Sequence, residues 1–367
     1  MFTKQISKIR HFINQERPYM IMLAFIFLIN AFLIAGDKLP VIADQVWSQK
    51  LAAESNIDKE EEFEDQVFID EDVLLERVEE DGERIIFLAN LLSFTVLAVF
   101  GLGLFLDLRI LIAFLKKRRI FQAGVKHISG KWGIWDIFRL MIIFVFLGYL
   151  LNIFEAHFLF NAAADHPLAN LFPMLNTGFL DLVILGFIIY FVKVRYKQSL
   201  ATIGLKTKGL ARNILLAMLS YIAFLPVLFV ILVLVVILSA LFNYHPPQQE
   251  VLKVFLQQRS IWVLCYTTIM VVFLGPVVEE VFFRGFAYNA IKRKIGKTSA
   301  MLLTAAIFAG LHANLIGFLP IMALGFLLVY MYEKTGSLVS SITIHILHNG
   351  VMVLLLFFGR YLVTLTQ

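Results

Sequence analysis

Apolar residues in this chain occur in separate blocks, and this pattern restricts the possible folds more than any other feature. A block of about 20 apolar residues, as a helix, can cross the roughly 30 Å hydrocarbon core of a bilayer. The chain of 367 residues is 60% hydrophobic and only 16% charged, whereas soluble domains are about 45–50% apolar and about 25% charged. These values exclude a soluble protein and predict an all-α, polytopic membrane protein with eight or nine transmembrane helices. The predicted spans are 18–36, 85–106 with an extension to 115, 140–161, 177–192, 213–243, 261–283, 299–318, 318–332 and 339–358.

Positive charge is distributed unevenly between the segments that connect these spans. If the N-terminus is cytoplasmic, 23 of the 32 Lys and Arg residues lie on the cytoplasmic side. The positive-inside rule favours this orientation. We therefore predict an integral protein of the cell membrane with a cytoplasmic N-terminus. The first apolar block, 18–36, exceeds the length of a signal-peptide core and is predicted to be an uncleaved anchor. The net charge is only +5, and nothing in its pattern indicates binding to nucleic acid.

An acidic segment follows the first predicted span. Residues 37–84 carry 17 of the 27 Asp and Glu residues, so this segment is too polar to cross a bilayer and is predicted to be extracytoplasmic. Runs of like charge usually form solvated loops, which is the simplest interpretation. The alternative is a short amphipathic helix that rests on the membrane or on an extracytoplasmic partner. The apolar positions that support this alternative are Val67, Ile69, Val73, Leu74 and Val78.

Polar and ionisable side chains inside the apolar blocks are concentrated in the last third of the chain. Insertion scales give a charged residue at the centre of a span a cost of about 2.5–3.5 kcal/mol, so such residues are candidates for function. The residues concerned are Glu279, Glu280, Arg284, His312, His345, His348 and Asn349.

Helical spacing predicts which of these side chains share a face. Glu280 and Arg284 are four residues apart, so we expect an ion pair between them. Glu279 is rotated by about 100° from Glu280 and can point elsewhere. His345 and Asn349 are also four residues apart and share a face.

The turns between the spans predict how deep these side chains lie. Glu279 and His312 are equally far in sequence from the centre of the basic cytoplasmic turn at 295–297. Each therefore lies about 20–25 Å along its helix from that turn. His345 and Asn349 follow the next cytoplasmic turn by about 13–20 Å of helix. We therefore expect the four side chains to surround one cavity that opens towards the cytoplasm. Pro276 is expected to kink the helix just before Glu279 and to free backbone carbonyls there.

This set of residue types suits two kinds of chemistry. A Glu beside a His can take a proton from water, and a second His or an Asn can donate a hydrogen bond to the oxyanion of an attacked amide. That chemistry is peptide hydrolysis. Alternatively, Glu279, His312 and His345 form a His₂Glu set that can ligate zinc and leave a fourth position for water. Spacing alone does not separate the two mechanisms.

At these residues the sequence resembles the CPBP family of intramembrane proteases, which includes the type II CAAX prenyl endopeptidases and bacterial Abi-type, bacteriocin-processing relatives. The resemblance covers roughly 200–367 and rests on three motifs on successive spans. The motifs are EExxxR at Glu279, Glu280 and Arg284, FxxxH at Phe308 and His312, and HxxxN at His345 and Asn349.

The resemblance implies an all-helical catalytic core with a cavity open to the cytoplasm. It implies that Glu279 and His312 activate water, that His345 and Asn349 stabilise the oxyanion, and that the Glu280–Arg284 ion pair supports them. The substrate would be a membrane-associated protein or peptide. Zinc remains an open prediction, because a metal requirement does not follow from the motifs.

The first 200 residues, with about four spans and the acidic segment, are not explained by the resemblance. We therefore predict an N-terminal membrane region, 1–200, and a protease core, 201–367. Asp107 and Arg109 are interpreted as an interfacial pair, and Phe308 and His348 as packing residues. Two other functions are considered: a proton-coupled transporter, because intramembrane Glu and His also relay protons, and a catalytically silent scaffold.

Overall fold

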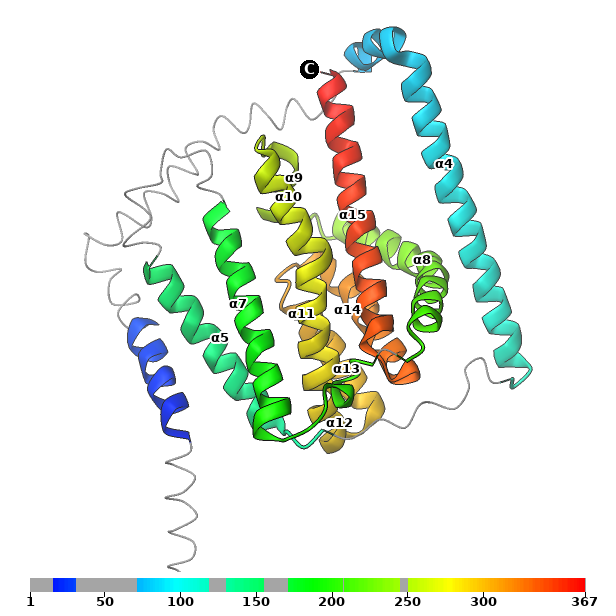
Figure 1. The fold of residues 1–367 in the computed structure, drawn as a ribbon. Helices are drawn as coiled ribbons and strands as arrows, with labels where there is room; N and C mark the ends of the chain where they lie inside the picture. Colours follow the sequence, from blue (N-terminus) through cyan, green and yellow to red (C-terminus); the bar gives the residue numbers. More distant parts are fainter. Residues whose placement is uncertain are drawn as a thin grey trace, which may run out of the picture. The chain divides into compact units, whose positions relative to one another are not determined.

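The computed structural model describes residues 16–30, 71–118, 130–154, 171–206, 208–244 and 250–366, and within these ranges it contains helices and turns and no strand. A helix over 16–30 comes first. The α-helices that follow (Figure 1) are α4 (Glu71–Leu115), α5 (Ile134–Phe154), α7 (Leu171–Ile189), α8 (Leu210–Leu241), α9 (Glu250–Gln257), α10 (Ile261–Ile269), α11 (Gly275–Glu280), α12 (Asn289–Ile295), α13 (Lys297–Gly310), α14 (Leu315–Thr335) and α15 (Leu338–Thr366). The π-helical segments are η2 (Tyr190–Arg195), η4 (Met270–Leu274) and η5 (Val281–Tyr288), and η3 (Leu200–Ile203) is a 3-10 helix.

Seven helical stretches among the described residues are long and apolar enough to cross a membrane, which confirms the all-α membrane class. They are Ile86–Leu115, Ile134–Phe154, Leu175–Arg195, Leu210–Leu241, Ile261–Ile295, Leu315–Thr335 and Leu338–Tyr361. The predicted first span, 18–36, lies partly outside the described residues. The acidic segment also lies mostly outside them, although α4 begins at Glu71 and therefore includes its last residues.

The predicted span 299–318 differs most from the structure. Helix α13 has 14 residues, about 21 Å at 1.5 Å per residue, which is shorter than the hydrocarbon core. The break before the next helix lies at 311–314 rather than at 318. Asn314 causes this shift, because its side chain accepts a hydrogen bond from the Gly317 backbone N–H at 2.9 Å and caps α14. Hydropathy cannot detect this cap, because the residues on both sides are apolar.

The chain divides into two compact units. The first unit comprises Met1–Gly82, Phe138–His166 and Tyr361–Gln367, and the second comprises Glu83–Ile137 and Pro167–Arg360. In the first unit, helix 16–30 contacts α5 through a 2.9 Å hydrogen bond from Tyr149 to the Asn30 side chain and an edge-on contact between Phe25 and Phe146. Helix α7 precedes the predicted boundary at 200, yet it belongs to the same unit as the motif-bearing helices.

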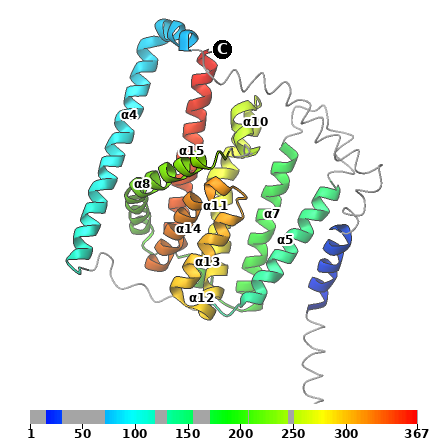
Figure 2. The same ribbon diagram turned by 180° about the vertical axis from the view of Figure 1, so that it is seen from behind.

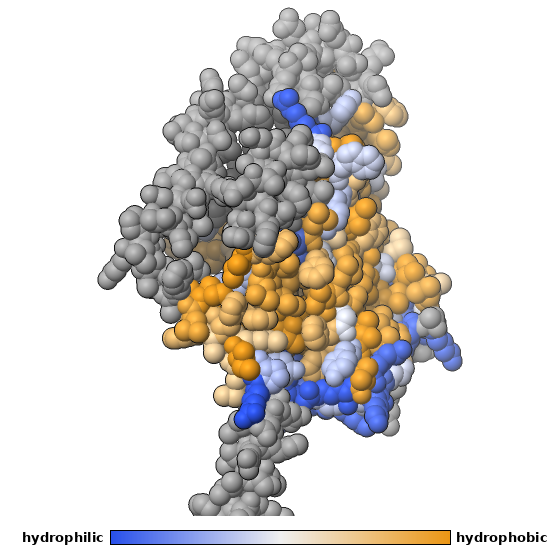
Figure 3. Space-filling view, turned by 60° about the vertical axis from the view of Figure 1, so that its left-hand side comes forward, coloured by the Kyte–Doolittle hydropathy of each residue, from blue (hydrophilic) through white to orange (hydrophobic). Residues whose placement is uncertain are grey.

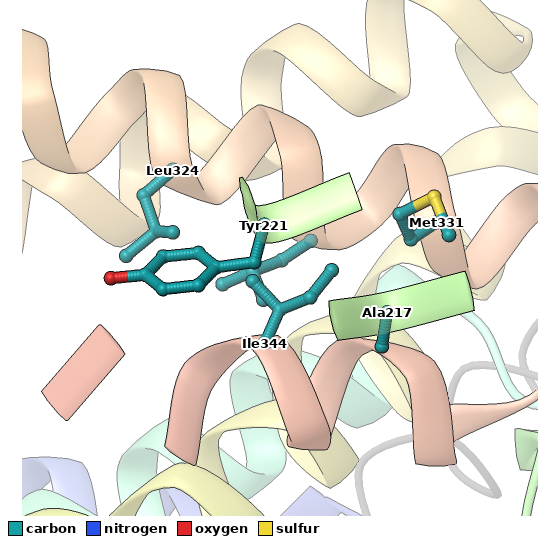
Figure 4. Packing of buried hydrophobic residues seen from close by; sticks show 6 residues of the cluster. Ala217, Tyr221, Leu324, Met331 and Ile344 are labelled. Carbon is teal, nitrogen blue, oxygen red and sulfur yellow. The ribbon is translucent and has the colours of Figure 1, made fainter. Parts of the chain in front are cut away.

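The core of the second unit is formed by side chains of α8, α14 and α15. Tyr221 of α8 extends between Leu324 of α14 and Ile344 of α15 (Figure 4). Ala217, one turn before Tyr221, is fully buried, so a small side chain occupies the position where α8 meets the other two helices. Burying a Leu, Ile or Met side chain, such as those of this cluster, stabilises the fold by about 1.5–3 kcal/mol where the side chain is removed from water. The remaining members of the cluster are Leu328 and Met331.

The outer surface of the second unit is apolar, as expected for helices in lipid. Large hydrophobic side chains point outwards from α4 and α8, and Phe100 of α4 contacts Phe229 of α8 with 5.6 Å between ring centroids. Figure 3 shows hydrophobic side chains gathered in a band on one face of the molecule, with hydrophilic residues below the band. This distribution, together with the seven stretches, makes the chain an integral membrane protein.

An ion-pair cluster fixes the basic turn that precedes α13 against the end of α14. Glu333 is buried and its carboxylate lies 2.7 Å from Lys292 Nζ and 3.4 Å from Lys297 Nζ. Tyr288 Oη donates a third bond to it, at 2.9 Å. Gly296 ends α12 at a φ of 82°, in the region that favours glycine. The two helices that carry Glu279 and Phe308 are therefore held together at this end.

Candidate active site

The two acidic residues of the EExxxR motif lie on one continuous helix that adopts the π-helical hydrogen-bond pattern in two places. The stretch Ile261–Ile295 contains η4 and η5, and the short α11 between them ends with Glu279 and Glu280. In η4 the Gly275 N–H bonds to the carbonyl of Met270, five residues back. Single π-helical turns inside α-helices occur frequently at functional sites. Neither segment was predicted from the sequence.

Asn349 satisfies a carbonyl that Pro276 leaves without a donor. In the π pattern of η4, the Val271 carbonyl requires an N–H from residue 276, and proline has none. Asn349 Nδ2 on α15 donates to this carbonyl at 2.7 Å. The predicted release of carbonyls before Glu279 is thus present, and the Asn of HxxxN is one of the groups that compensates for it. The same amide group carries a second hydrogen, which the predicted oxyanion role requires.

Glu280 is at the centre of the site and is completely buried. Its Oε1 accepts a hydrogen bond from Arg284 Nη1 at 2.7 Å, which is the ion pair expected from the spacing. The same oxygen lies 3.1 Å from His345 Nδ1. Because a carboxylate only accepts hydrogen bonds, this contact places the ring hydrogen on Nδ1 and directs Nε2 away from Glu280. This contact between Glu280 and His345 was not predicted from the sequence.

Glu279 lies on the other side of His345. Its Oε2 is 3.9 Å from His345 Nε2, and its side chain is 36% exposed, in contrast to the buried Glu280. That Oε2 atom is shielded and has no hydrogen-bond partner among the described residues. Glu280 Oε2 is likewise without a hydrogen-bond partner there, so the two residues differ in exposure: Glu279 is partly exposed, while Glu280 is fully buried and holds Arg284 and His345 through Oε1.

His312 lies in the turn after α13 rather than on a helix, and it is exposed. Its Nδ1 is 2.8 Å from the Phe308 carbonyl. A carbonyl can only accept, so Nδ1 carries the hydrogen and Nε2 is the free, basic nitrogen. The structure thus holds one nitrogen of His312 and leaves the other unbonded to any described residue of the site.

The ring of Phe308, interpreted as packing from the sequence, connects the three motifs. Its centroid is 4.9 Å from the ring of His312, 5.7 Å from that of His345 and 4.5 Å from the guanidinium carbon of Arg284. A cation over an aromatic face is attracted by the ring quadrupole. Gly325 of α14 makes room for this arrangement, because a Cβ there would lie 3.2 Å from Phe308 Cδ1. The Gly325 carbonyl also accepts a 3.2 Å bond from Arg284 Nη2.

The three predicted zinc ligands do not converge on one point. Glu279 and His345 approach each other, but among the described residues no group of three His, Cys, Asp or Glu side chains is placed to hold a metal ion. Glu279, His312 and His345 therefore do not form a ligand set in this structure, and the zinc site stays a prediction.

Two further residues border this site. His348 Nδ1 lies 3.3 Å from Tyr221 Oη, in agreement with its interpretation as a packing residue. Asp181 lies on α7, which contacts α11, the short helix that ends with Glu279 and Glu280. Asp181 was not among the predicted site residues, although an acidic residue inside an apolar block is a sufficient signal for one.

Comparisons with known proteins agree with the position of this cluster. Residues 260–351 match the family model "Rce1-like: Type II CAAX prenyl endopeptidase Rce1-like". The chain carries an Rce1-like domain at its C-terminus. All the predicted site residues lie inside this Rce1-like domain, from Glu279 to Asn349. The match supports a protease as the general activity, and this range falls within the predicted core 201–367.

A curated relative covers a similarly short part of the chain. The Bacillus subtilis protein named "Putative membrane peptidase YdiL" is 30% identical over 82 residues, which are 22% of this chain and 34% of that protein. The chain thus matches about a third of the length of this relative. No solved structure matches the chain.

Proposed function

We propose that this protein is an intramembrane endopeptidase that hydrolyses a peptide bond of a membrane-associated protein or peptide. One observation carries the proposal. Glu279 and His345 come from different helices and approach to 3.9 Å, while the buried Glu280 holds the other ring nitrogen of His345 at 3.1 Å. A pair of titratable groups inside a membrane span, with one oxygen of Glu279 unbonded to other described residues, suits water activation better than a purely structural role.

Glu279 is proposed as the general base. A water molecule that donates to Glu279 loses this proton as its oxygen attacks the carbonyl carbon of the substrate. His312 is the predicted partner in this step, because its free Nε2 can hold the same water while Nδ1 stays on the Phe308 carbonyl. The proton then moves to the amine nitrogen as the C–N bond breaks.

His345 and Asn349 are proposed to stabilise the oxyanion that forms during the attack. His345 in its protonated form carries a hydrogen on Nε2, which faces Glu279, and Glu280 beside Nδ1 supports that charge. Asn349 contributes the amide hydrogen that is not bound to Val271. Removing one oxyanion donor typically costs about 10²–10³-fold in kcat. Arg284 balances the charge of Glu280 and fixes its position.

The proposed topology places the catalytic cavity towards the cytoplasm of the cell membrane, with a cytoplasmic N-terminus. The basic turns at the ends of α12 and α14 support this orientation. The bilayer itself is then part of the substrate-binding environment. The acidic segment 37–84 is proposed to be extracytoplasmic and available to a partner there.

The test is a cleavage assay on the purified full-length protein in lipid vesicles. The probes are a pool of single-span synthetic peptides and a second pool that ends in farnesylated CaaX sequences, with products identified by mass spectrometry. The wild type is compared with His345→Gln and with the matched control His348→Gln on the same helix. We expect cleavage by the wild type and the control, and a loss of about 10²-fold or more for His345→Gln.

The other outcomes separate the alternatives. Cleavage that is equal in the wild type and His345→Gln contradicts the proposed role of His345. If the wild type cleaves neither pool but moves protons across the vesicle membrane, the protein is a proton-coupled transporter. If it does neither, the scaffold interpretation replaces the proposal. Metal analysis of the same preparation tests the zinc prediction.

A further inference from the structure

A short segment at the start of α5, residues 130–136, contacts the helix of Glu279 although it lies outside the Rce1-like domain. The contact is made by Trp132, which is fully buried. Its indole Nε1 donates a hydrogen bond to the Phe286 carbonyl at 2.8 Å, and its ring stacks on the Phe286 ring with 5.1 Å between centroids. The segment and Phe286 belong to the same compact unit. The Rce1-like domain is therefore bound by a residue from an earlier part of the chain.

The backbone around Trp132 fixes the position of the indole ring. Asp136 is buried and accepts hydrogen bonds from the Gly133 N–H, at 2.8 Å, and from the Tyr196 hydroxyl. A Cβ on Gly130 would lie 2.4 Å from Trp132 Cη2, so the chain passes directly against the ring. A buried Trp requires a partner for its N–H, and this packing directs the N–H at the Phe286 carbonyl.

The carbonyl that Trp132 binds lies where the π-helical η5 changes to α12. Three successive carbonyls at this change accept hydrogen bonds from side chains. Asn289 Nδ2 donates to those of Arg284 and Gly285, at 3.4 and 2.8 Å, and Trp132 donates to that of Phe286. A π-helix and an α-helix differ in residues per turn, so a change of η5 to the α pattern would rotate the residues on its two sides relative to each other. These side-chain donors favour the π pattern.

The rotation of η5 matters for the active site because two of its side chains contact groups around His345. Arg284 Nη1 binds Glu280 at 2.7 Å, and the Phe283 ring contacts the Phe308 ring with 5.2 Å between centroids. Glu280 and the Phe308 ring both contact His345. Helix α7 and η3, which also precede the Rce1-like domain, contact η5 too, and both ribbon views show α7 beside α11 (Figures 1 and 2).

We propose that Trp132 is a positioning residue for the active site, because it holds η5 in the π-helical form that keeps Glu280 and His345 in place. This inference rests on the proposed function. Trp132 acts through Phe286 and not by contact with the reacting atoms. A displacement of about 1 Å at the reacting groups can lower a rate by about 100-fold. Loss of the Trp132 contact should therefore lower kcat and leave KM unchanged.

The test compares two matched pairs of variants of the full-length protein in lipid vesicles. Trp132→Phe keeps an aromatic ring and removes the N–H donor, and its control, Trp262→Phe, makes the same change at a side chain that is 74% exposed. Gly130→Ala places a Cβ against the indole, and its control, Gly133→Ala, places one where nothing lies within 4 Å. Both kcat and KM are measured per folded protein, well below every melting temperature, with the peptide that the wild type cleaves fastest.

We expect Trp132→Phe to lower kcat by about 10- to 100-fold with KM unchanged. Gly130→Ala should lower kcat by a smaller factor, and both controls should behave like the wild type. Hydrogen exchange, followed by mass spectrometry, adds a measurement that needs no substrate. The fragment that covers 281–288 should exchange about 10-fold faster in Trp132→Phe than in Trp262→Phe, because η5 loses one of its hydrogen bonds.

Each other result overturns the inference. A wild-type kcat per folded protein in Trp132→Phe and Gly130→Ala, whatever their melting temperatures, assigns Trp132 to packing alone. A lower kcat with unchanged exchange of 281–288 means that Trp132 does not act through η5. If neither variant folds, Trp132 is required for folding rather than for positioning. If the wild type cleaves no peptide of either pool, the proposed function itself fails, and that failure is visible before any variant is compared.

Discussion

Replacing Glu280 with Gln tests whether Glu280 stabilises the fold, in contrast to the catalytic role proposed for Glu279. Glu280 is fully buried, and its Oε1 receives Arg284 at 2.7 Å and His345 at 3.1 Å. Glutamine keeps an acceptor oxygen at the same place but removes the negative charge. The variant therefore leaves the Arg284 cation buried without a counter-ion, with one carbonyl, that of Gly325, and the faces of two Phe rings around it.

The magnitude follows from the burial of both partners. Two unit charges about 4 Å apart attract by about 4 kcal/mol at an effective dielectric constant of about 20. Breaking a buried pair by removing one partner costs about 3–5 kcal/mol, because the other charge stays desolvated. The Arg284 side chain is 1% exposed and that of Glu280 is 0% exposed, so solvent offers little compensation. We expect Glu280→Gln to lower the free energy of unfolding by about 3 kcal/mol.

The assay is reversible unfolding of the full chain in detergent micelles, followed by circular dichroism. Glu279→Gln is the matched control, since it makes the same change one residue away on a side chain that is 36% exposed. The control should change stability by less than about 1 kcal/mol. The double replacement Glu280→Gln with Arg284→Met should regain most of the loss, because it removes the unpaired charge. If Glu280→Gln is as stable as the control, the reasoning about this buried pair is wrong.

Three further predictions concern the neighbouring residues and the topology. His312→Ala should reduce cleavage by about 10²-fold or more, measured in vesicles, without changing the melting temperature, because the side chain is exposed; full activity contradicts its role. Asn349→Ala should lower the free energy of unfolding by about 1 kcal/mol, measured in micelles, because a partly buried carbonyl loses its donor; unchanged stability contradicts this account. With Cys265 removed, an impermeant maleimide should label a cysteine at Ser55 in intact cells and one at Lys294 only after lysis, and the reverse pattern inverts the topology.

The helices and the membrane class were predictable because burial in lipid leaves a local signal. Apolar blocks of sufficient length identify the long spans, and helical spacing alone gives the Glu280–Arg284 ion pair, which the structure confirms. Prediction was less successful where the chain is apolar on both sides of a boundary. The cap at Asn314 ends the loop before α14 four residues earlier than the predicted boundary at 318, and places His312 in a turn instead of on a helix.

The rest of the site depends on contacts that no local pattern encodes. A π-helical segment has the same hydropathy as an α-helix, so η4 and η5 were not predicted. The bond from Asn349 to Val271 arises because Pro276 lacks an N–H in that register. Glu280 and His345 are 65 residues apart in sequence, and their contact depends on how the two helices that carry them pack together.

The central claim is that Glu279 takes the proton of the hydrolytic water. Its most direct test is the rate at which Glu279→Gln cleaves the fastest wild-type peptide, with both proteins reconstituted in equal amounts and shown to have the same melting temperature. A general base contributes about 10²–10⁴-fold to such a rate, so the account predicts a fall of at least about 100-fold. Cleavage by Glu279→Gln at the wild-type rate would contradict it.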